Sequence, residues 1–137
     1  MKKILVLVGF LFLFYFTVFC SSSLASTIVY DQTIGGSYGT ENNQFKYPQG
    51  IDVDSNGRVC VADNYNHRVQ VFNSNKELLF TIGVTGTSGD DNSHLSYPYD
   101  CTFDSSGRIY VADYGNDRVQ IYSNGGSYLY TINMLLN

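Results

Sequence analysis

One combination of polar side chains occurs twice in the chain at the same spacing. An aspartate is followed by an asparagine three positions later and by an arginine two positions after that, and the combination returns fifty residues on. A carboxylate beside a guanidinium can bind a ligand or work as an acid–base pair, but it can also close a turn by accepting turn N–H groups and pairing with the arginine. Because an active site is normally assembled once, we interpret the duplicated set as a structural clasp between one blade and the next. Its members are Asp63, Asn66, Arg68, Asp113, Asn116 and Arg118.

Ligand contacts are expected where the two copies differ. The turns that hold the asparagines read NYNH at residues 64–67 and YGND at residues 114–117. Loops carried by a rigid scaffold are where binding residues concentrate. A tyrosine surrounded by histidine, asparagine and aspartate can grip a protein or a sugar, although the same residues also suit a solvated turn. The candidate ligand contacts are Asn64, Tyr65, His67, Tyr114 and Asp117.

Signals of catalysis and metal binding are weak. The two histidines, His67 and His94, have no metal-ligand spacing, and no serine lies in a Gly-x-Ser-x-Gly turn. Oxygen donors cluster at residues 89–94, but they depart from the EF-hand spacing and lack its final glutamate. A solvated loop is therefore preferred to a calcium site. We predict no catalytic residue, no cofactor and no metal.

Four short runs rich in apolar and β-branched residues position these groups in each copy. Residues 47–82 match residues 97–132 without a gap, and DSNG and DSSG turns recur at the same place. Short strands joined by such turns predict a four-stranded antiparallel meander for each copy, so the chain after its N-terminal segment should be all-β. The runs cover residues 50–55, 58–63, 68–73 and 77–83, and then 100–105, 108–113, 118–123 and 127–133.

Both faces of each predicted sheet are apolar. Side chains alternate along a strand, so Val59 and Val61 point to one face while Cys60 and Ala62 point to the other. The second copy has the same alternation at residues 109–112. A sheet with two apolar faces expects a neighbour on each side, and four-stranded sheets stacked radially are the blades of a β-propeller.

The repeated stretch resembles the NHL repeat family. The sequence GTENNQFKYPQGIDVDSNGRVCVADNYNHRVQVFNSNKELLFTIG carries a Pro-x-Gly start, an Asp-Ser-x-Gly turn and a Val-Ala-Asp-x-x-Asn-x-Arg-Val-Gln core. The second copy departs at Asp100 and Cys101, where the first has Gly50 and Ile51. TIGGSYGTENNQFK, from Thr33, resembles the end of a partial upstream repeat. The resemblance implies propeller blades, usually about six to a ring, with roles from protein or RNA binding to an amidating lyase and sensor domains.

The N-terminus has the pattern of a secretory signal peptide. Lys2 and Lys3 precede an apolar run over residues 4–19, and the small residues Ser23 and Ala25 then form an A-x-A-like cleavage site. We expect a secreted or cell-surface protein. A membrane is a partner only if this segment stays uncleaved as an anchor or if Cys20 is lipidated. The net charge of −4 becomes more negative once the lysines are removed, which disfavours a nucleic-acid partner.

The expected organisation combines these segments. A signal peptide (1–25) is followed by a lead-in strand and connector (26–46), a first blade (47–83), a connector (84–96) and a second blade (97–133). We predict an exported, non-catalytic binding module whose protein or carbohydrate ligand is held by turns and connectors at one end of the propeller. The alternative is a degenerate exported propeller enzyme of the lyase or lactonase kind, which would need oligomerisation to form its site.

Two further expectations concern the faces of the blades. Two blades can cover only the two faces between them, so the ring is completed by copies of this chain or by another chain, or the sequence is a segment cut from a longer propeller. Of these we expect copies to associate head to tail, as a homotrimer if the ring has about six blades. Cys60 and Cys101 fall in adjacent blades. We expect buried thiols at both positions, and a disulfide stays open because it requires Cα atoms within about 7 Å.

Overall fold

The computed structural model of the protein describes residues 33–133. These residues form β-strands and two short 3-10 helices, and there is no α-helix among them. No helix in this part of the chain is long and apolar enough to cross a membrane. The predicted signal peptide, residues 1–25, lies outside the described residues. So does most of the predicted strand at residues 27–34, whose last two residues are not part of a strand.

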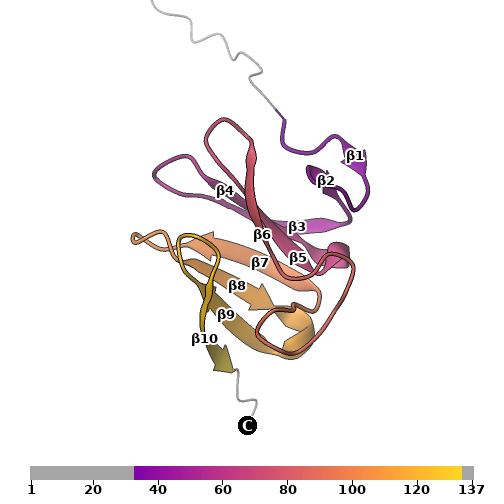
Figure 1. Cartoon of the computed structure of the whole chain (residues 1–137), viewed down its shortest axis with the longest axis vertical. Coiled ribbons are helices and arrows are strands. Elements are labelled where there is room, and N and C mark those ends of the chain that lie inside the picture. Colours follow the sequence, from indigo (N-terminus) through magenta and orange to yellow (C-terminus); the bar gives the residue numbers. More distant parts are fainter. Residues whose placement is uncertain (1–32, 134–137) are drawn as a thin grey trace, which may run out of the picture. The chain divides into compact units, whose positions relative to one another are not determined.

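The first sheet is an antiparallel meander of four strands that pair in chain order (Figure 1). Its first turn is closed by Asp54, whose carboxylate accepts the N–H groups of Asn56 and Arg58 at 2.9 Å each and pairs with the Arg58 guanidinium at 2.8 Å. This local chemistry sets the register of the strands on either side. The strands are β3 (Pro48–Val53), β4 (Val59–Asp63), β5 (Arg68–Phe72) and β6 (Leu78–Ile82).

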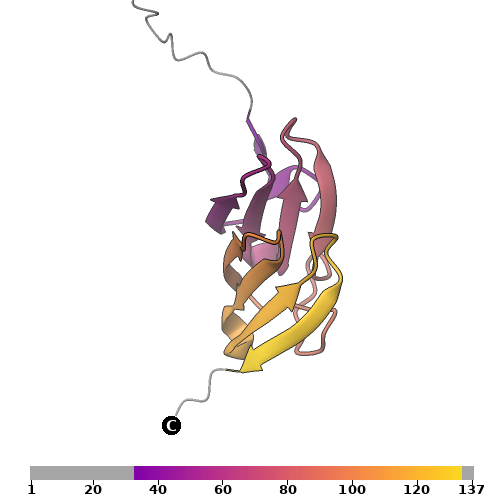
Figure 2. The ribbon, with the colours of Figure 1, turned by 90° about the vertical axis from the view of Figure 1, so that its left-hand side faces the viewer.

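The second sheet repeats the first in topology and in turn chemistry, and Figure 2 shows it from another side. Asp104 accepts the N–H groups of Ser106 and Arg108 at 2.9 Å each, as Asp54 does in the first sheet. The prediction of all-β, four-stranded antiparallel blades in an incomplete ring is thereby confirmed for the described residues. The strands are β7 (Pro98–Phe103), β8 (Ile109–Asp113), β9 (Arg118–Tyr122) and β10 (Tyr128–Asn133).

A loop of the same form precedes each sheet. In the lead-in loop, residues 33–46, β1 (Ser37–Tyr38) pairs in parallel with β2 (Gln44–Phe45). In the connector loop, residues 84–96, Ser88 and Leu95 form a parallel bridge at the equivalent positions. The structural repeat is therefore a loop followed by a sheet, and it occurs twice.

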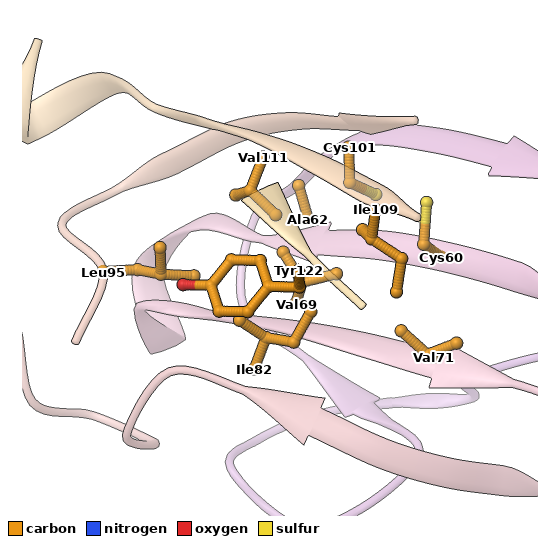
Figure 3. Packing of buried hydrophobic residues seen from close by; sticks show 10 residues of the cluster. All are labelled: Cys60, Ala62, Val69, Val71, Ile82, Leu95, Cys101, Ile109, Val111 and Tyr122. Carbon is orange, nitrogen blue, oxygen red and sulfur yellow. The ribbon is translucent and has the colours of Figure 1, made fainter. Parts of the chain in front are cut away.

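The main core lies between the two sheets. β7 packs against β3 and β4, and Figure 3 shows side chains of both sheets meeting there. Leu95 of the connector loop is fully buried in the same cluster. The buried members are Cys60, Ala62, Val69, Val71, Ile82, Leu95, Cys101, Ile109, Val111 and Tyr122.

The two cysteines are buried, free thiols, one on each sheet. The Cys60 side chain and burial raise the pKa of the Cys101 thiol. Figure 3 shows both cysteines at the same end of the core. Both therefore serve as small apolar groups where the two sheets meet.

The outer face of the first sheet requires a correction to the sequence-based expectation. Val59, Val61 and Phe72 form a second buried cluster, and Ile34 and Phe45 of the lead-in loop pack against it. The expectation that two blades cover only the faces between them is therefore wrong for this part of the sheet. The sequence pattern showed an apolar face but could not show that a preceding loop folds back onto it.

Candidate binding surface

The first Asp–Asn–Arg set forms a buried network. The Arg68 Nε and Asp63 Oδ2 atoms are 2.7 Å apart, and these two side chains are 2% and 0% exposed. Asn66 donates to the same carboxylate oxygen at 2.9 Å, while the other oxygen accepts the Lys46 N–H at 2.7 Å. Every one of these bonds is charge-assisted at the aspartate, which makes them the stronger kind of hydrogen bond.

This network ties the first sheet to the lead-in loop. Arg68 donates to the carbonyl oxygens of Glu41 and Gln44, both at 2.9 Å. Asn66 donates to the Gly39 carbonyl at 2.8 Å. On its other side Arg68 reaches the Thr85 hydroxyl in the connector loop at 3.1 Å. One guanidinium therefore binds the backbone of the lead-in loop and a side chain of the connector loop.

The second set repeats this arrangement with the connector loop. Arg118 pairs with Asp113 at 2.7 Å and donates to the carbonyl oxygens of Asp91 at 2.8 Å and His94 at 3.1 Å. Backbone oxygens in residues 89–94, where the sequence had suggested calcium, thus bind the guanidinium. The Asp91 carboxylate accepts the N–H groups of Ser93 and His94 at 2.8 and 3.0 Å, which caps the loop.

Two features of these networks differ from the sequence interpretation. Each network joins a sheet mainly to the loop before it, whereas direct blade-to-blade contact had been expected. Gln70 also belongs to the first network, because its amide donates to the Gln44 carbonyl at 2.9 Å and to Asp63 at 3.3 Å. Gln70 lies two residues after Arg68 on the same face of β5, so strand alternation alone could have identified it.

Exposed tyrosines lie together at the end of the sheets where these loops meet. Ring centroids are 6.1 Å apart for Tyr38 and Tyr47, 4.7 Å for Tyr47 and Tyr65, and 5.7 Å for Tyr65 and Tyr97. These four residues, the tyrosine ridge, are between 43% and 68% exposed. The ridge runs from the lead-in loop to the start of the second sheet, and it is the candidate binding surface.

The scaffold holds the ridge through constrained backbone. Tyr47 and Tyr97 each precede a proline and have φ of 48° and 47°, a left-handed conformation that is uncommon for bulky residues. Tyr65 is carried by the 3-10 helix η1 (Asn64–Asn66), and its N–H donates to the Lys46 carbonyl at 3.1 Å. The rings are thus presented at positions that the folded backbone has already fixed.

The five predicted ligand contacts fall into two groups. Three are exposed: Tyr65, Tyr114 and Asp117. The ring centroids of Tyr114 and of the exposed Tyr99 are 6.1 Å apart. Asn64 and His67 are buried and bond across the sheet interface instead. Asn64 donates to the Pro98 carbonyl at 3.0 Å, and the His67 Nδ1 atom accepts the Tyr97 N–H at 3.1 Å.

Several surface tyrosines were missed by the reasoning from sequence. Tyr38, Tyr47, Tyr97 and Tyr99 lie outside the two turns that had been singled out. A Tyr-Pro pair at the start of both copies was the available signal for Tyr47 and Tyr97. Within residues 33–133, no three histidine, cysteine, aspartate or glutamate side chains are grouped so that they could hold a metal ion.

His67 makes the stability of this surface depend on pH. Burial lowers the pKa of His67 below its usual 6.5, although the nearby Asp113 charge opposes the shift. Below about pH 6.5 the unfolded chain therefore binds more protons at this residue than the folded chain, so stability falls as the pH is lowered from 7 to 5. In His67→Asn, which removes the titrating ring at a left-handed position that asparagine tolerates, we expect a smaller loss of Tm over this range. An unchanged pH slope in the variant would contradict the assignment.

Comparison with known proteins identifies the type of the sequence repeat. Residues 45–72 and 95–122 match the model of the NHL repeat. The B-box type zinc finger protein ncl-1 of Caenorhabditis elegans is 40% identical over 45 residues, which make up 33% of this chain and 5% of that protein. Protein brain tumor of Drosophila melanogaster is 35% identical over 48 residues, 35% of this chain and 5% of that protein. The similarity thus spans a small part of either relative, and it confirms the resemblance drawn from the repeated motif.

Proposed function

The chain carries two NHL repeats, and from this premise we propose that it is an exported, non-catalytic interaction module that binds a protein partner through the tyrosine ridge. The single observation that carries the proposal is the row of Tyr38, Tyr47, Tyr65 and Tyr97 with neighbouring rings in contact range and open to solvent.

The chemistry of the ridge suits a protein surface. Tyrosine offers a large apolar ring with a polar hydroxyl and has few rotatable bonds, so it loses little entropy on binding and is common among the residues that dominate interface energetics. The Lys46 ammonium lies 5.8 Å from the centre of the Tyr38 ring and adds a cation at one end of the ridge. A partner segment with apolar or aromatic side chains flanked by a carboxylate fits this surface.

A carbohydrate ligand would use the same rings, because exposed aromatic faces can stack on sugars. Photo-crosslinking separates the two classes. A benzophenone amino acid placed at position 65 should give protein adducts when the exported protein is mixed with the proteins of its own extracellular medium. The same group placed at exposed Ser74, in the turn between β5 and β6, is the matched control. Binding on a glycan array, with no protein adduct specific to position 65, would replace the protein by a carbohydrate ligand.

Substitution within the ridge measures its contribution to binding. Tyr65 is central in the row and exposed, so Tyr65→Ala should weaken binding of the crosslinked partner by about 30-fold, as for a hot-spot residue, and leave Tm close to the wild-type value. Leu79→Ala, at an equally exposed apolar residue on β6, is the control and should bind normally. Equal affinity of the two variants would rule out the ridge as the site.

Export is supported by the N-terminal pattern of two lysines, an apolar run and a cleavage site with the small residues Ser23 and Ala25. Sequencing the N-terminus of the protein that cells release should give Ser26 as the first residue. Protein retained in membranes and starting at Met1 would mean that it is anchored.

A further inference from the structure

We propose that the open face of the second sheet binds the open face of the first sheet in another copy of this chain, repeating between chains the contact that the two sheets make within one chain. Residues fifty positions apart are structurally equivalent, so the internal contact is a template for the external one. The proposal is independent of the ligand that the tyrosine ridge binds.

The internal contact has two sides with defined members. On the first sheet the side chains are Cys60, Ala62, Val69 and Ile82, and all four are buried in the core between the sheets. On the second sheet and its loop they are Leu95, Cys101, Phe103 and Val111, which pack into the same core.

The equivalent residues on the outer faces are apolar as well. Those equivalent to the first set form the trailing face, and those equivalent to the second set form the leading face. The trailing face consists of Tyr110, Ala112, Val119 and Ile132. The leading face consists of Phe45, Ile51, Val53 and Val61.

Exposure at equivalent positions shows what the missing neighbour would cover. Ile82 is 3% exposed in the internal contact, whereas its equivalent Ile132 is 50% exposed. Cys101 is 2% exposed, whereas its equivalent Ile51 is 63% exposed. The lead-in loop covers Val61 but leaves the part of the leading face on β3 open. In the internal contact the leading side is supplied by β7, which packs on β3 and β4. Because β3 is the equivalent of β7 in the first sheet, the open part is the part that a neighbour needs.

The closest approach of the two sheets cannot be identical in the internal contact and in the contact between chains. Internally, a Cβ atom on Gly50 would lie 1.9 Å from Asp100 Oδ1 and 2.6 Å from Asp100 Cα, so the two strands meet where one residue is a glycine. Between chains, Asp100 takes the place of Gly50 and already carries a Cβ atom, so the strands of the two copies must lie further apart at this point than β3 and β7 do within one chain. Shallow hollows lie beside both positions, one lined by Tyr110 and Ala112 and the other by Ile51 and Val61.

The arginine that makes a polar contact across the internal interface also has an equivalent on the trailing side of the second sheet. The Arg58 terminal nitrogens donate to the Asn124 carbonyl at 3.0 Å and the Gly107 carbonyl at 3.2 Å in the second sheet. Arg108, its equivalent, pairs with Asp104 in the same way but is 42% exposed. In the head-to-tail contact its guanidinium would reach the backbone around Gly57 of the next copy.

Two face-specific variants of the full exported protein test the proposal. Ile51→Glu places a charge on the leading face and Ile132→Glu places one on the trailing face, and each side chain is exposed enough for the sheet to fold around the change. Wild-type protein should show masses that are multiples of the single chain in light scattering and sedimentation. Each variant alone should be monomeric, and an equimolar mixture should form a 1:1 dimer and nothing larger, because one intact contact remains.

Controls keep the outcome decisive. Val84→Glu, at an exposed residue of the connector loop outside both faces, should assemble like wild type. Should Ile132→Glu lower Tm, Arg108→Glu replaces it as the trailing-side variant. A monomeric wild-type protein at tens of micromolar, variants that assemble as wild type does, or a mixture of the two variants that stays monomeric would each overturn the proposal.

Discussion

Arg68→Ala should lower the free energy of unfolding by about 3 kcal/mol or more, the loss typical when one partner of a buried ion pair is removed. The guanidinium is 2% exposed and holds the Asp63 carboxylate, two backbone carbonyl oxygens of the lead-in loop and the Thr85 hydroxyl. Without it a buried carboxylate loses its cation and the lead-in loop loses two of its hydrogen bonds to the first sheet. For a domain of this size the expected fall in Tm is about 10 °C or more.

Two comparisons test the cause of this effect. Arg118→Ala should behave similarly, because Arg118 holds Asp113 and the connector loop in the same geometry. Arg108→Ala should lower the Tm of the single chain much less, since that side chain is 42% exposed and its ion pair with Asp104 is partly solvated. Wild-type melting of Arg68→Ala would show that the networks do not support the fold.

Gly50→Ala should also be strongly destabilising, by about 1–3 kcal/mol, the usual cost of overpacking. The added methyl group would lie 2.6 Å from Asp100 Cα, so relief requires β3 and β7 to move apart. That movement would loosen the core between the two sheets. Denaturant unfolding monitored by far-UV circular dichroism gives the measurement.

Matched variants isolate the steric cause. A Cβ atom on Gly125 would meet nothing within 4 Å, so Gly125→Ala should leave stability almost unchanged. Asp100→Gly in the Gly50→Ala background should restore part of the loss, because it removes the Oδ1 contact but keeps the backbone contact. Equal stability of the two alanine variants would mean that the strands do not approach as closely as described.

Local patterns in the sequence determined the two meanders, their strands and their turns. Alternation of apolar residues and Asp-Ser-x-Gly turns act within a few residues, as Asp54 does when it accepts the N–H groups of Asn56 and Arg58. For the same reason the sequence identified the duplicated Asp–Asn–Arg sets and two exposed turn tyrosines, Tyr65 and Tyr114. The same alternation of side chains occurs in both copies of the repeat and indicated that each sheet has two apolar faces.

Only the tertiary structure decided what these units contact. Arg68 donates to the carbonyl oxygens of Glu41 and Gln44, which lie 27 and 24 residues earlier in the chain. Every residue has a backbone carbonyl, so the sequence does not indicate which of them will accept this hydrogen bond. The return of the lead-in loop onto Val59 and Val61, the meeting of Cys60 with Cys101, and the alignment of four tyrosines from three segments have the same origin. Each depends on how distant segments pack, because side-chain alternation specifies a face but does not specify its neighbour.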